Sequence, residues 1–445
     1  MSEDCLYLNV WRPINETETL RPVMVYIHGG AFVMGTIFSL FTDSKHIAQT
    51  GDVVIVSLAY RLGAFGFLYA DDEKAPGNLG LHDMILGLQW VRDNAEKFGG
   101  NPNQVTLYGC SAGSMAIGSL ILSPMTTGLF HRAIMQGGAP NSNFGTVSKH
   151  GALEITKDFA QKIDCYSNVT DEMINCLKAK TMNEITEKLS MTFNVTNEFF
   201  VPIYGDDFMP KSPIESLRDG LFQSNVDIMY GVARDEGTYF IWKIFPEMAK
   251  DDVVITVEKA RQSIVHLMNN LFNQTFGDEV ASFYLNHLKE PSQDELKLAI
   301  AQAWGDYQMV CPTILFGEEY AKHRPNGHYY SYRMMQMFPF LENIPSWIGV
   351  GHAQDTIYMF LQSLLKRNID KQLSNDIIRV MTNFAKTGNP GMMNLNDDTT
   401  KWVEAFKNDD NHFTQYMSWN ASNYQMIDNY YVKVCNEFWK SRIVQ

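Results

Sequence analysis

The fold of this chain is decided by the stretch Val105-Thr106-Leu107-Tyr108-Gly109-Cys110-Ser111-Ala112-Gly113. A β-branched run leads directly into the pattern Gly-x-Ser-x-Gly, and a run of small and apolar residues with helical character follows from Ser114 to Leu122. Small residues are needed where a serine sits on a sharp turn between a strand and a helix, because larger neighbours would collide with the adjacent elements. The stretch predicts that Ser111 is a nucleophile. The alternative is an ordinary glycine-rich turn between a strand and a helix.

Strands and helices alternate on both sides of this stretch. Residues 78–98 carry apolar side chains at steps of three and four, which is the period of a helix. Short runs that predict strands occur at Val23–Ile27, Val53–Leu58, Val105–Tyr108, Ala133–Gln136, Asp227–Val232 and His328–Tyr332. The run Val53–Leu58 is almost continuously apolar, as expected for a strand buried on both faces. This alternation predicts an α/β fold with a mostly parallel central sheet covered by helices on both faces. A helical, charged stretch from 146 to 225 indicates an insertion. No repeat or long linker divides the chain, so we expect one domain over residues 1–445.

A glycine-rich loop, His28-Gly29-Gly30-Ala31, follows the first predicted strand. Acyl transfer places negative charge on a carbonyl oxygen, and fixed backbone N–H groups stabilise that charge. In hydrolases one such N–H comes from the residue after the nucleophile, here Ala112, and others come from a glycine-rich loop after an early strand. Gly30, Ala31 and Ala112 are therefore the candidate oxyanion hole. A plain glycine turn is the alternative for this loop.

The composition excludes several classes of function. The 445 residues include 36 Lys and Arg against 50 Asp and Glu, a net charge of −14, and so acidic a surface repels nucleic acid. Hydrophobic residues make up 45% of the chain and charged residues 19%, as in a globular protein with a large core. The longest nearly apolar run, Met115–Leu122, is too short to span a bilayer. No signal-peptide pattern and no apolar C-terminal tail are present in the sequence, and we expect no transmembrane segment.

Three segments are similar to motifs of the type-B carboxylesterases, the cholinesterase-like branch of the α/β-hydrolase fold. They are Ser2-Glu3-Asp4-Cys5-Leu6-Tyr7-Leu8-Asn9-Val10, the stretch from Phe98-Gly99-Gly100-Asn101-Pro102 through Ser111, and Asn383-Phe384-Ala385-Lys386-Thr387-Gly388-Asn389-Pro390. The resemblance covers essentially the whole chain. The family carries further residues before the first segment, so this chain resembles a member without that N-terminal part.

The resemblance implies a Ser-Glu-His triad. The family acid lies in a segment that here is Gly231-Val232-Ala233-Arg234-Asp235-Glu236-Gly237, which implies Glu236, with Asp235 as the nearest competitor. The histidine lies in a segment that here is Gly349-Val350-Gly351-His352. The implied activity is cleavage of carboxylic esters through an acyl-enzyme, with no metal and no organic cofactor. The expected partner is a small-molecule ester, and a homo-oligomer is a further possibility.

Four positions depart from the family pattern. Cys110 stands where many members carry a glutamate, which weakens the case for cationic choline esters. Its thiol is either a second nucleophile or an inert small residue. Gly137 replaces a serine, and Ala353 and Asp355 replace the commoner glycine and glutamate. Two alternatives to a carboxylesterase that acts on neutral esters remain. One is a cholinesterase, and the other is an adhesion module on the same fold.

The cysteines and glycosylation motifs indicate a secretory protein. Six cysteines occur without a CxxC pair, so a structural zinc site is not expected. The family resemblance implies the disulfides Cys165–Cys176 and Cys311–Cys435, leaving Cys5 and Cys110 unpaired. Asn-x-Ser/Thr motifs predict glycosylation and an extracellular location, and they lie at Asn15, Asn168, Asn194, Asn273 and Asn420.

Overall fold

The computed structural model describes residues 2–15, 17–39, 42–189, 200–250, 253–271, 274–339, 344–406 and 414–443. Two predicted glycosylation motifs, at Asn194 and Asn273, lie outside these residues. Across the described parts of the chain, we find no helix with the length and apolar character needed to cross a membrane.

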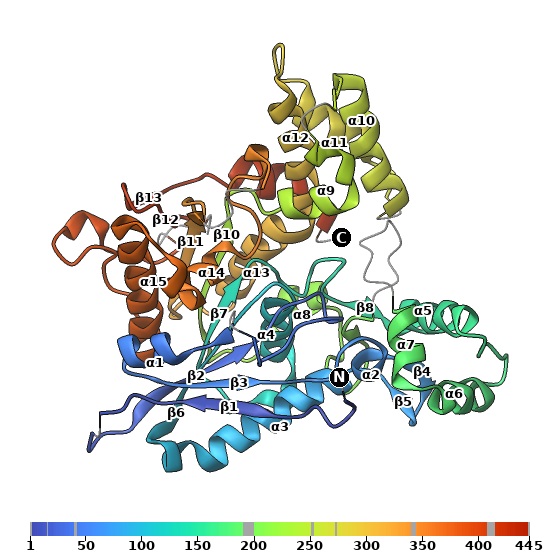
Figure 1. Cartoon of the computed structure of the whole chain (residues 1–445), viewed down its shortest axis with the longest axis horizontal. Coiled ribbons are helices and arrows are strands. Elements are labelled where there is room, and N and C mark those ends of the chain that lie inside the picture. Colours follow the sequence, from blue (N-terminus) through green and yellow to red (C-terminus); the bar gives the residue numbers. More distant parts are fainter. Residues whose placement is uncertain are drawn as a thin grey trace.

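A twisted sheet forms the centre of the molecule (Figure 1). Within the described residues it has nine strands, in the order β1-β3-β2-β6-β7-β10-β11-β12-β13. The strands are β1 (Leu8–Trp11), β2 (Arg21–Ile27), β3 (Val54–Leu58), β6 (Gly100–Cys110), β7 (Arg132–Gln136), β10 (Asp227–Ala233), β11 (Tyr329–Met334), β12 (Tyr416–Trp419) and β13 (Gln425–Ile427). All neighbouring pairs from β3 to β12 are parallel, whereas β1 and β13 pair antiparallel at the two edges. The prediction of an α/β fold with a mostly parallel sheet is confirmed.

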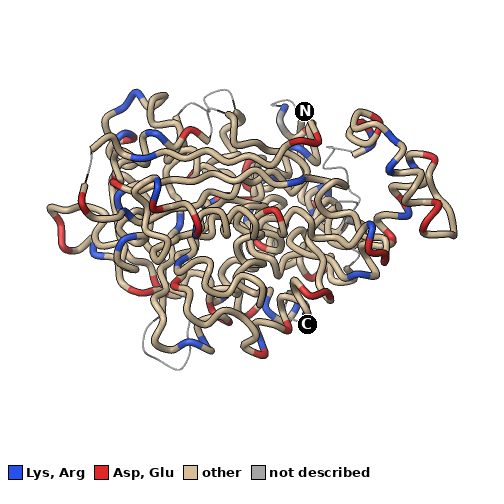
Figure 2. The backbone as a smooth tube through the Cα atoms, turned by 90° about the horizontal axis from the view of Figure 1, so that it is seen from below, with Lys and Arg blue, Asp and Glu red and all other residues tan. Residues whose placement is uncertain are grey.

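The central strands are buried on both faces, which explains their continuous apolar sequences. Along β2, Val23, Val25 and Ile27 face one hydrophobic core, whereas Met24 and Tyr26 face another. Because successive side chains of a strand point to opposite faces, both sets of residues must be apolar when helices cover both sides. The positions of Lys, Arg, Asp and Glu lie mainly around the periphery of the molecule, and the central strands carry few of them (Figure 2).

Helices cover both faces of the sheet (Figure 1). One core includes residues of α1 (Lys45–Gly51), α14 (Gln354–Phe360) and α15 (Asn368–Thr387). The other includes residues of α3 (Leu79–Asn94), α4 (Ala112–Leu122), α8 (Pro213–Arg218), α12 (Gln293–Gly305) and α13 (Cys311–Lys322). The remaining α-helices are α2 (Gly63–Phe67), α5 (Lys149–Lys162), α6 (Thr170–Ala179), α7 (Met182–Lys188), α9 (Thr238–Ile244), α10 (Val257–His266), α11 (Gly277–Leu285) and α16 (Lys440–Ile443).

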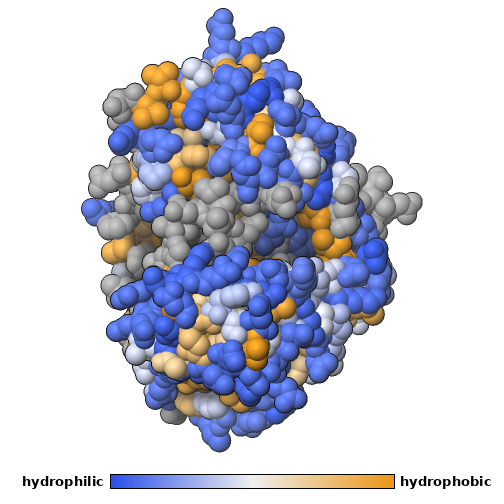
Figure 3. Space-filling view, turned by 90° about the vertical axis from the view of Figure 1, so that its right-hand side faces the viewer, coloured by the Kyte–Doolittle hydropathy of each residue, from blue (hydrophilic) through white to orange (hydrophobic). Residues whose placement is uncertain are grey.

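The predicted helical insertion contains α5–α8 and one short strand pair, and a second short pair precedes it in the sequence. These pairs join β4 (Tyr69–Asp72) to β5 (Ala75–Pro76), and β8 (Val147–Ser148) to β9 (Ile203–Tyr204). The face of the molecule that carries α5–α7 and α10 is mainly hydrophilic, with apolar residues in separate groups (Figure 3).

Two disulfides join the cysteines that the family resemblance pairs. Cys165 is bonded to Cys176, and Cys311 to Cys435, while Cys5 and Cys110 are free. The Cys311–Cys435 bond ties the start of α13 to the C-terminal helical segment. It closes a long loop of chain, and cross-links of this kind stabilise a fold by restricting its unfolded state.

Candidate active site

Ser111 lies at the tip of a sharp turn between β6 and α4. Its backbone has φ of 60° and ψ of −127°, and it is the residue before the first turn of α4. A positive φ is uncommon for a residue with a side chain, and strained backbone of this kind is concentrated at functional sites. The turn therefore holds the serine at the carboxyl end of a central strand, where ligands bind in open α/β sheets.

The two glycines of the Gly-x-Ser-x-Gly pattern are explained by the neighbouring strand β2. A Cβ atom on Gly109 would lie 2.5 Å from the carbonyl oxygen of Ile27, and one on Gly113 would lie 2.1 Å from the same oxygen. Both distances are far shorter than a van der Waals contact, and the Ile27 carbonyl belongs to the backbone of β2, which cannot easily move. The small residues thus allow the turn to pack directly against the end of β2.

Glu236 and His352 are joined by a hydrogen bond. The Nδ1–H of His352 donates to Oε2 of Glu236 at 2.5 Å, and the backbone N–H of Ala233 donates to Oε1 of Glu236 at 2.7 Å. Both side chains are nearly inaccessible to solvent, with 8% exposure for His352 and 2% for Glu236. The other ring nitrogen of His352, Nε2, is buried and has no hydrogen-bond partner among the described residues. The carboxylate therefore fixes the ring and leaves Nε2 available as a base.

Asp235, the competitor for the acid role, pairs with the backbone of the histidine loop. Its Oδ2 accepts a hydrogen bond from the backbone N–H of Val350 at 2.8 Å, and its own N–H donates to the Val350 carbonyl at 2.9 Å. Arg234 forms an ion pair with the same carboxylate at 2.7 Å. The hydroxyl of Thr238 lies 2.7 Å from the Ile348 carbonyl oxygen. These contacts fix the backbone from which His352 projects.

The end of β7 lies between the serine and the Glu-His pair. The backbone N–H of Ser111 donates to the carbonyl of Gln136 at 2.9 Å. The next residue, Gly137, has φ of 58°, and a Cβ atom there would lie 2.7 Å from Oε1 of Glu236. Gln136, the last residue of β7, thus contacts Ser111, and Gly137, which follows it, lies against Glu236. The glycine that departs from the family pattern gives Glu236 the space that a serine in this position would occupy.

The glycine-rich loop has an unusual backbone beside Ser111. Gly30, Ala31 and Phe32 all have positive φ, at 118°, 54° and 61°. A Cβ atom on Gly29 would lie 3.1 Å from the Cβ of Ser111, so the loop passes close to the nucleophile. Within the described residues, the backbone N–H groups of the three predicted oxyanion-hole residues donate no hydrogen bond. Burial lowers the pKa of His28, which begins the loop, to about 4, so its ring is neutral at neutral pH.

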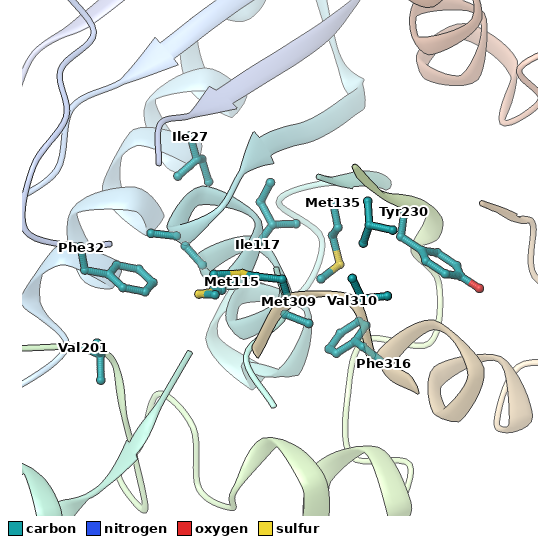
Figure 4. Close-up of a cluster of buried hydrophobic side chains, with 14 of the residues drawn as sticks. Ile27, Phe32, Met115, Ile117, Met135, Val201, Tyr230, Met309, Val310 and Phe316 are labelled. Atoms are coloured by element: carbon teal, nitrogen blue, oxygen red, sulfur yellow. The ribbon is translucent and has the colours of Figure 1, made fainter. Parts of the chain in front are cut away.

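A small cavity opens at Ser111. It has a volume of about 20 Å³, room for roughly one water molecule. Apart from Ser111, its walls are apolar and consist of Ala31, Ala112, Met115, Phe144, Val201, Phe240 and Met309. Figure 4 shows Met115 of α4 and Met309 from the segment before α13 next to each other. The ring of Phe240 also lies 4.9 Å from that of His352, so this wall joins the serine cavity to the imidazole.

The sequence did not indicate the wall residues Phe144, Val201, Phe240 and Met309. Of these four residues, only Phe240 lies close in sequence to a predicted site residue, because it follows Glu236 by one helical turn and belongs to α9. The other three come from segments far apart in the chain, and each has the character of an ordinary core residue.

Cys110 precedes Ser111 in an environment that disfavours a reactive thiolate. It is buried, and burial, followed by the nearby Asp355 carboxylate, raises the pKa of its thiol well above its ordinary value. The thiolate is the nucleophilic form of cysteine, and it is disfavoured here at neutral pH. Of the two roles considered for Cys110, the structure favours the inert one.

Asp355 is a buried carboxylate behind the Glu-His pair. Burial, and then the charge of Glu236, raise its pKa, while the hydroxyl of Tyr332 donates to its Oδ2 at 2.5 Å. A raised pKa means that the folded state binds the proton more tightly than the unfolded state. The contribution of Asp355 to stability is therefore present at acid pH and is lost as the pH rises through the folded-state value.

We expect the variant Asp355→Asn to gain stability relative to the wild type as the pH rises from about 4 to about 8. The amide keeps an acceptor for Tyr332 but never becomes charged. Each unit by which the pKa is raised corresponds to a gain of about 1.4 kcal/mol in the free energy of unfolding. Denaturant unfolding of both proteins across this range measures the difference. A difference that does not change with pH would contradict the expectation.

The chain is similar to known proteins over most of its length. The model of the carboxylesterase family matches residues 1–439. The acetylcholinesterase of Bungarus fasciatus is 34% identical over 405 residues, which are 88% of this chain and 65% of that protein. The acetylcholinesterase of Danio rerio is 33% identical over 457 residues, covering 93% of this chain and 71% of that protein. The chain thus spans about two thirds of the length of these relatives.

Proposed function

Because this chain belongs to the carboxylesterase family, we propose that it is a serine hydrolase that cleaves carboxylic esters through an acyl-enzyme. The observation that carries the proposal is the pairing of Glu236 with His352 at 2.5 Å, which leaves Nε2 of the ring without a partner among the described residues. A buried imidazole oriented in this way acts as a general base toward a hydroxyl nucleophile. Ser111 is the proposed nucleophile. Phe240 lines the cavity at Ser111, and its ring lies 4.9 Å from the ring of His352.

The proposed reaction has two steps. In the first, Ser111 Oγ attacks the ester carbonyl carbon while His352 Nε2 takes the hydroxyl proton. The tetrahedral intermediate then expels the alcohol, which receives that proton from the imidazolium. In the second step water, deprotonated by Nε2, attacks the acyl-enzyme, the acid is released and the serine regains its proton. Glu236 stabilises the imidazolium throughout.

The three unpaired amides would stabilise the oxyanion in both steps. Those of Gly30 and Ala31 come from the strained loop beside Ser111, and that of Ala112 lies at the N-terminus of α4, where the helix dipole is positive. Loss of one such donor typically lowers the rate by about 10² to 10³-fold. The cavity volume of about 20 Å³ requires its walls to move before an acyl group enters. The flexible side chains of Met115 and Met309 are suited to that movement.

A covalent label tests the assignment of the nucleophile. We expect a neutral organophosphate to add one phosphoryl group to the full chain, located on the peptide that contains Ser111 by mass spectrometry. Cys110→Ala is the matched control, because it removes the adjacent thiol, and it should still be labelled. A label on any other residue, or loss of the label in Cys110→Ala with the protein still folded, would overturn the assignment.

A second candidate is a cholinesterase. Its support is the name of the two relatives, together with the net charge of −14, which attracts cations to the protein. Cys110 argues for neutral esters instead, because no carboxylate stands directly beside the nucleophile. We expect acetylthiocholine to be cleaved no more than about tenfold faster, in kcat/KM, than a neutral thioacetate of the same size. A larger preference would favour the cholinesterase.

We also propose that the protein is extracellular and glycosylated. Its two disulfides are typical of oxidising compartments. Of the motifs in the described residues, Asn15 and Asn168 are exposed and Asn420 is partly exposed, as attachment of a glycan requires. Assembly into a homo-oligomer remains a prediction.

A further inference from the structure

A large polar cleft lies between α1 and α15, and it shares no lining residue with the cavity at Ser111. Its volume is about 580 Å³, within the range of about 300 to 1,000 Å³ that is usual for small-molecule sites. Figure 1 shows α1 and α15 side by side on one face of the sheet. The polar residues that line this α1–α15 cleft include His46, Thr50, Gln372, Asn375, Asp376 and Asn396.

The spacing of these residues creates two facing polar surfaces. His46 and Thr50 are four residues apart on α1, and Gln372 and Asp376 are four apart on α15, so each pair lies on one side of its helix. Asn375 adds a further amide, whose Oδ1 accepts a hydrogen bond from Gln362 at 2.7 Å. Asn396 contributes a side-chain amide without a hydrogen bond to any described residue.

The floor of the cleft is held by hydrogen bonds among its own residues. The buried carboxylate of Asp376 accepts hydrogen bonds from Gln372 at 3.1 Å, Tyr424 at 3.1 Å and Arg379 at 2.7 Å. Arg379 also donates to the carbonyl of Met393 at 2.6 Å and thereby ties the segment that carries Asn396 to α15. A preformed site loses little entropy on binding.

The cleft is electrically balanced, in contrast to the acidic protein around it. Its only oppositely charged side chains, Asp376 and Arg379, form an ion pair at 2.7 Å. Burial lowers the pKa of His46, which keeps that ring neutral at neutral pH. What remains is a set of amides and a hydroxyl, groups that both donate and accept hydrogen bonds. Such a surface is complementary to an uncharged ligand whose own groups also donate and accept hydrogen bonds.

We propose that the α1–α15 cleft binds a neutral saccharide. Each sugar hydroxyl both donates and accepts, so it can pair with the amides of Gln372, Asn375 and Asn396 and with the hydroxyl of Thr50. Leu395, 63% exposed at the rim, offers an apolar surface to the C–H groups of a sugar ring. This assignment is independent of the proposed esterase activity.

Two sources could supply the saccharide: a free sugar, or the protein's own glycan at Asn15. The backbone N–H of Ile14 lies 3.4 Å from the side-chain oxygen of Gln49, the residue before Thr50, so Asn15 stands beside α1. A glycan attached there would begin close to the cleft.

The first experiment uses the full chain produced without glycans and N,N′-diacetylchitobiose as the probe. Titration calorimetry should detect binding, and the double variant Gln372→Leu/Asn396→Leu should weaken it about tenfold or more. Both residues are exposed, so the substitutions leave the core intact. The control Asn183→Leu, an exposed residue of α7, should bind like the wild type. Absence of binding, or equal binding by the double variant, would overturn the proposal.

A second arm identifies the source. If the Asn15 glycan fills the cleft, the glycosylated protein should not bind the probe, and Asn15→Gln should restore binding and increase hydrogen exchange in α15. If a free sugar is the ligand, glycosylated and unglycosylated proteins should bind alike. Either pattern supports a saccharide site, provided that the double variant weakens binding in the first experiment.

Discussion

The variant Ser111→Ala is expected to lower kcat for short p-nitrophenyl esters by about 10⁶-fold, as loss of the nucleophile does in other serine hydrolases. Without the hydroxyl no acyl-enzyme can form, and His352 has no proton to take from the enzyme. The backbone amides of the oxyanion hole are unchanged, so slow residual hydrolysis by water, about 10³ to 10⁴-fold above the uncatalysed rate, should remain. Initial rates with purified protein measure the effect.

A serine on the same helix provides the control for this prediction. Ser119 lies on α4, and its hydroxyl donates only to the carbonyl of Met115 at 3.0 Å, within the helix. Ser119→Ala should therefore keep wild-type activity, and thermal unfolding should show that both variants fold. Retention of more than about one tenth of the activity by Ser111→Ala would refute the nucleophile assignment.

The variant Glu236→Gln is expected to lower kcat by about 10⁴-fold, the effect of the equivalent change in a protease triad. Both carboxylate oxygens of Glu236 accept hydrogen bonds, one from Ala233 N–H and one from His352 Nδ1–H. A glutamine has one acceptor oxygen, so its NH₂ group must face one of the two donors. If it faces the ring, the proton moves to Nε2, and the imidazole can no longer take a proton from Ser111.

Asp235→Asn is the matched control, since it makes the same kind of change at the adjacent residue. The amide oxygen of asparagine can still accept the hydrogen bond from Val350, while only the ion pair with the partly exposed Arg234 is lost. We expect kcat to fall by less than about tenfold. If Asp235→Asn were the more damaging variant, the acid would be Asp235, and the proposed triad would be wrong.

The sequence predicted the central sheet well because its signals are local. β2, β3, β6, β7, β10 and β11 each overlap a strand predicted from the sequence. A strand buried on both faces is mainly apolar, and β3 carries that signal along its whole length. The strands β1, β12 and β13, at the two ends of the sheet, were not predicted. They are only three or four residues long. Strands this short carry too little pattern to be distinguished from loops.

The sequence by itself determined the turn that carries Ser111, because its glycines, its strand and its helix are neighbours along the chain. The family resemblance implied Glu236 rather than Asp235 as the acid. Only the tertiary structure shows their different contacts, because Glu236 accepts a hydrogen bond from His352 whereas Asp235 accepts one from the Val350 N–H. The same holds for Gly137, whose lack of a side chain matters because β7 passes beside Glu236. The α1–α15 cleft also arises only on folding, because its two helices are separated by most of the chain and each alone presents ordinary surface amides.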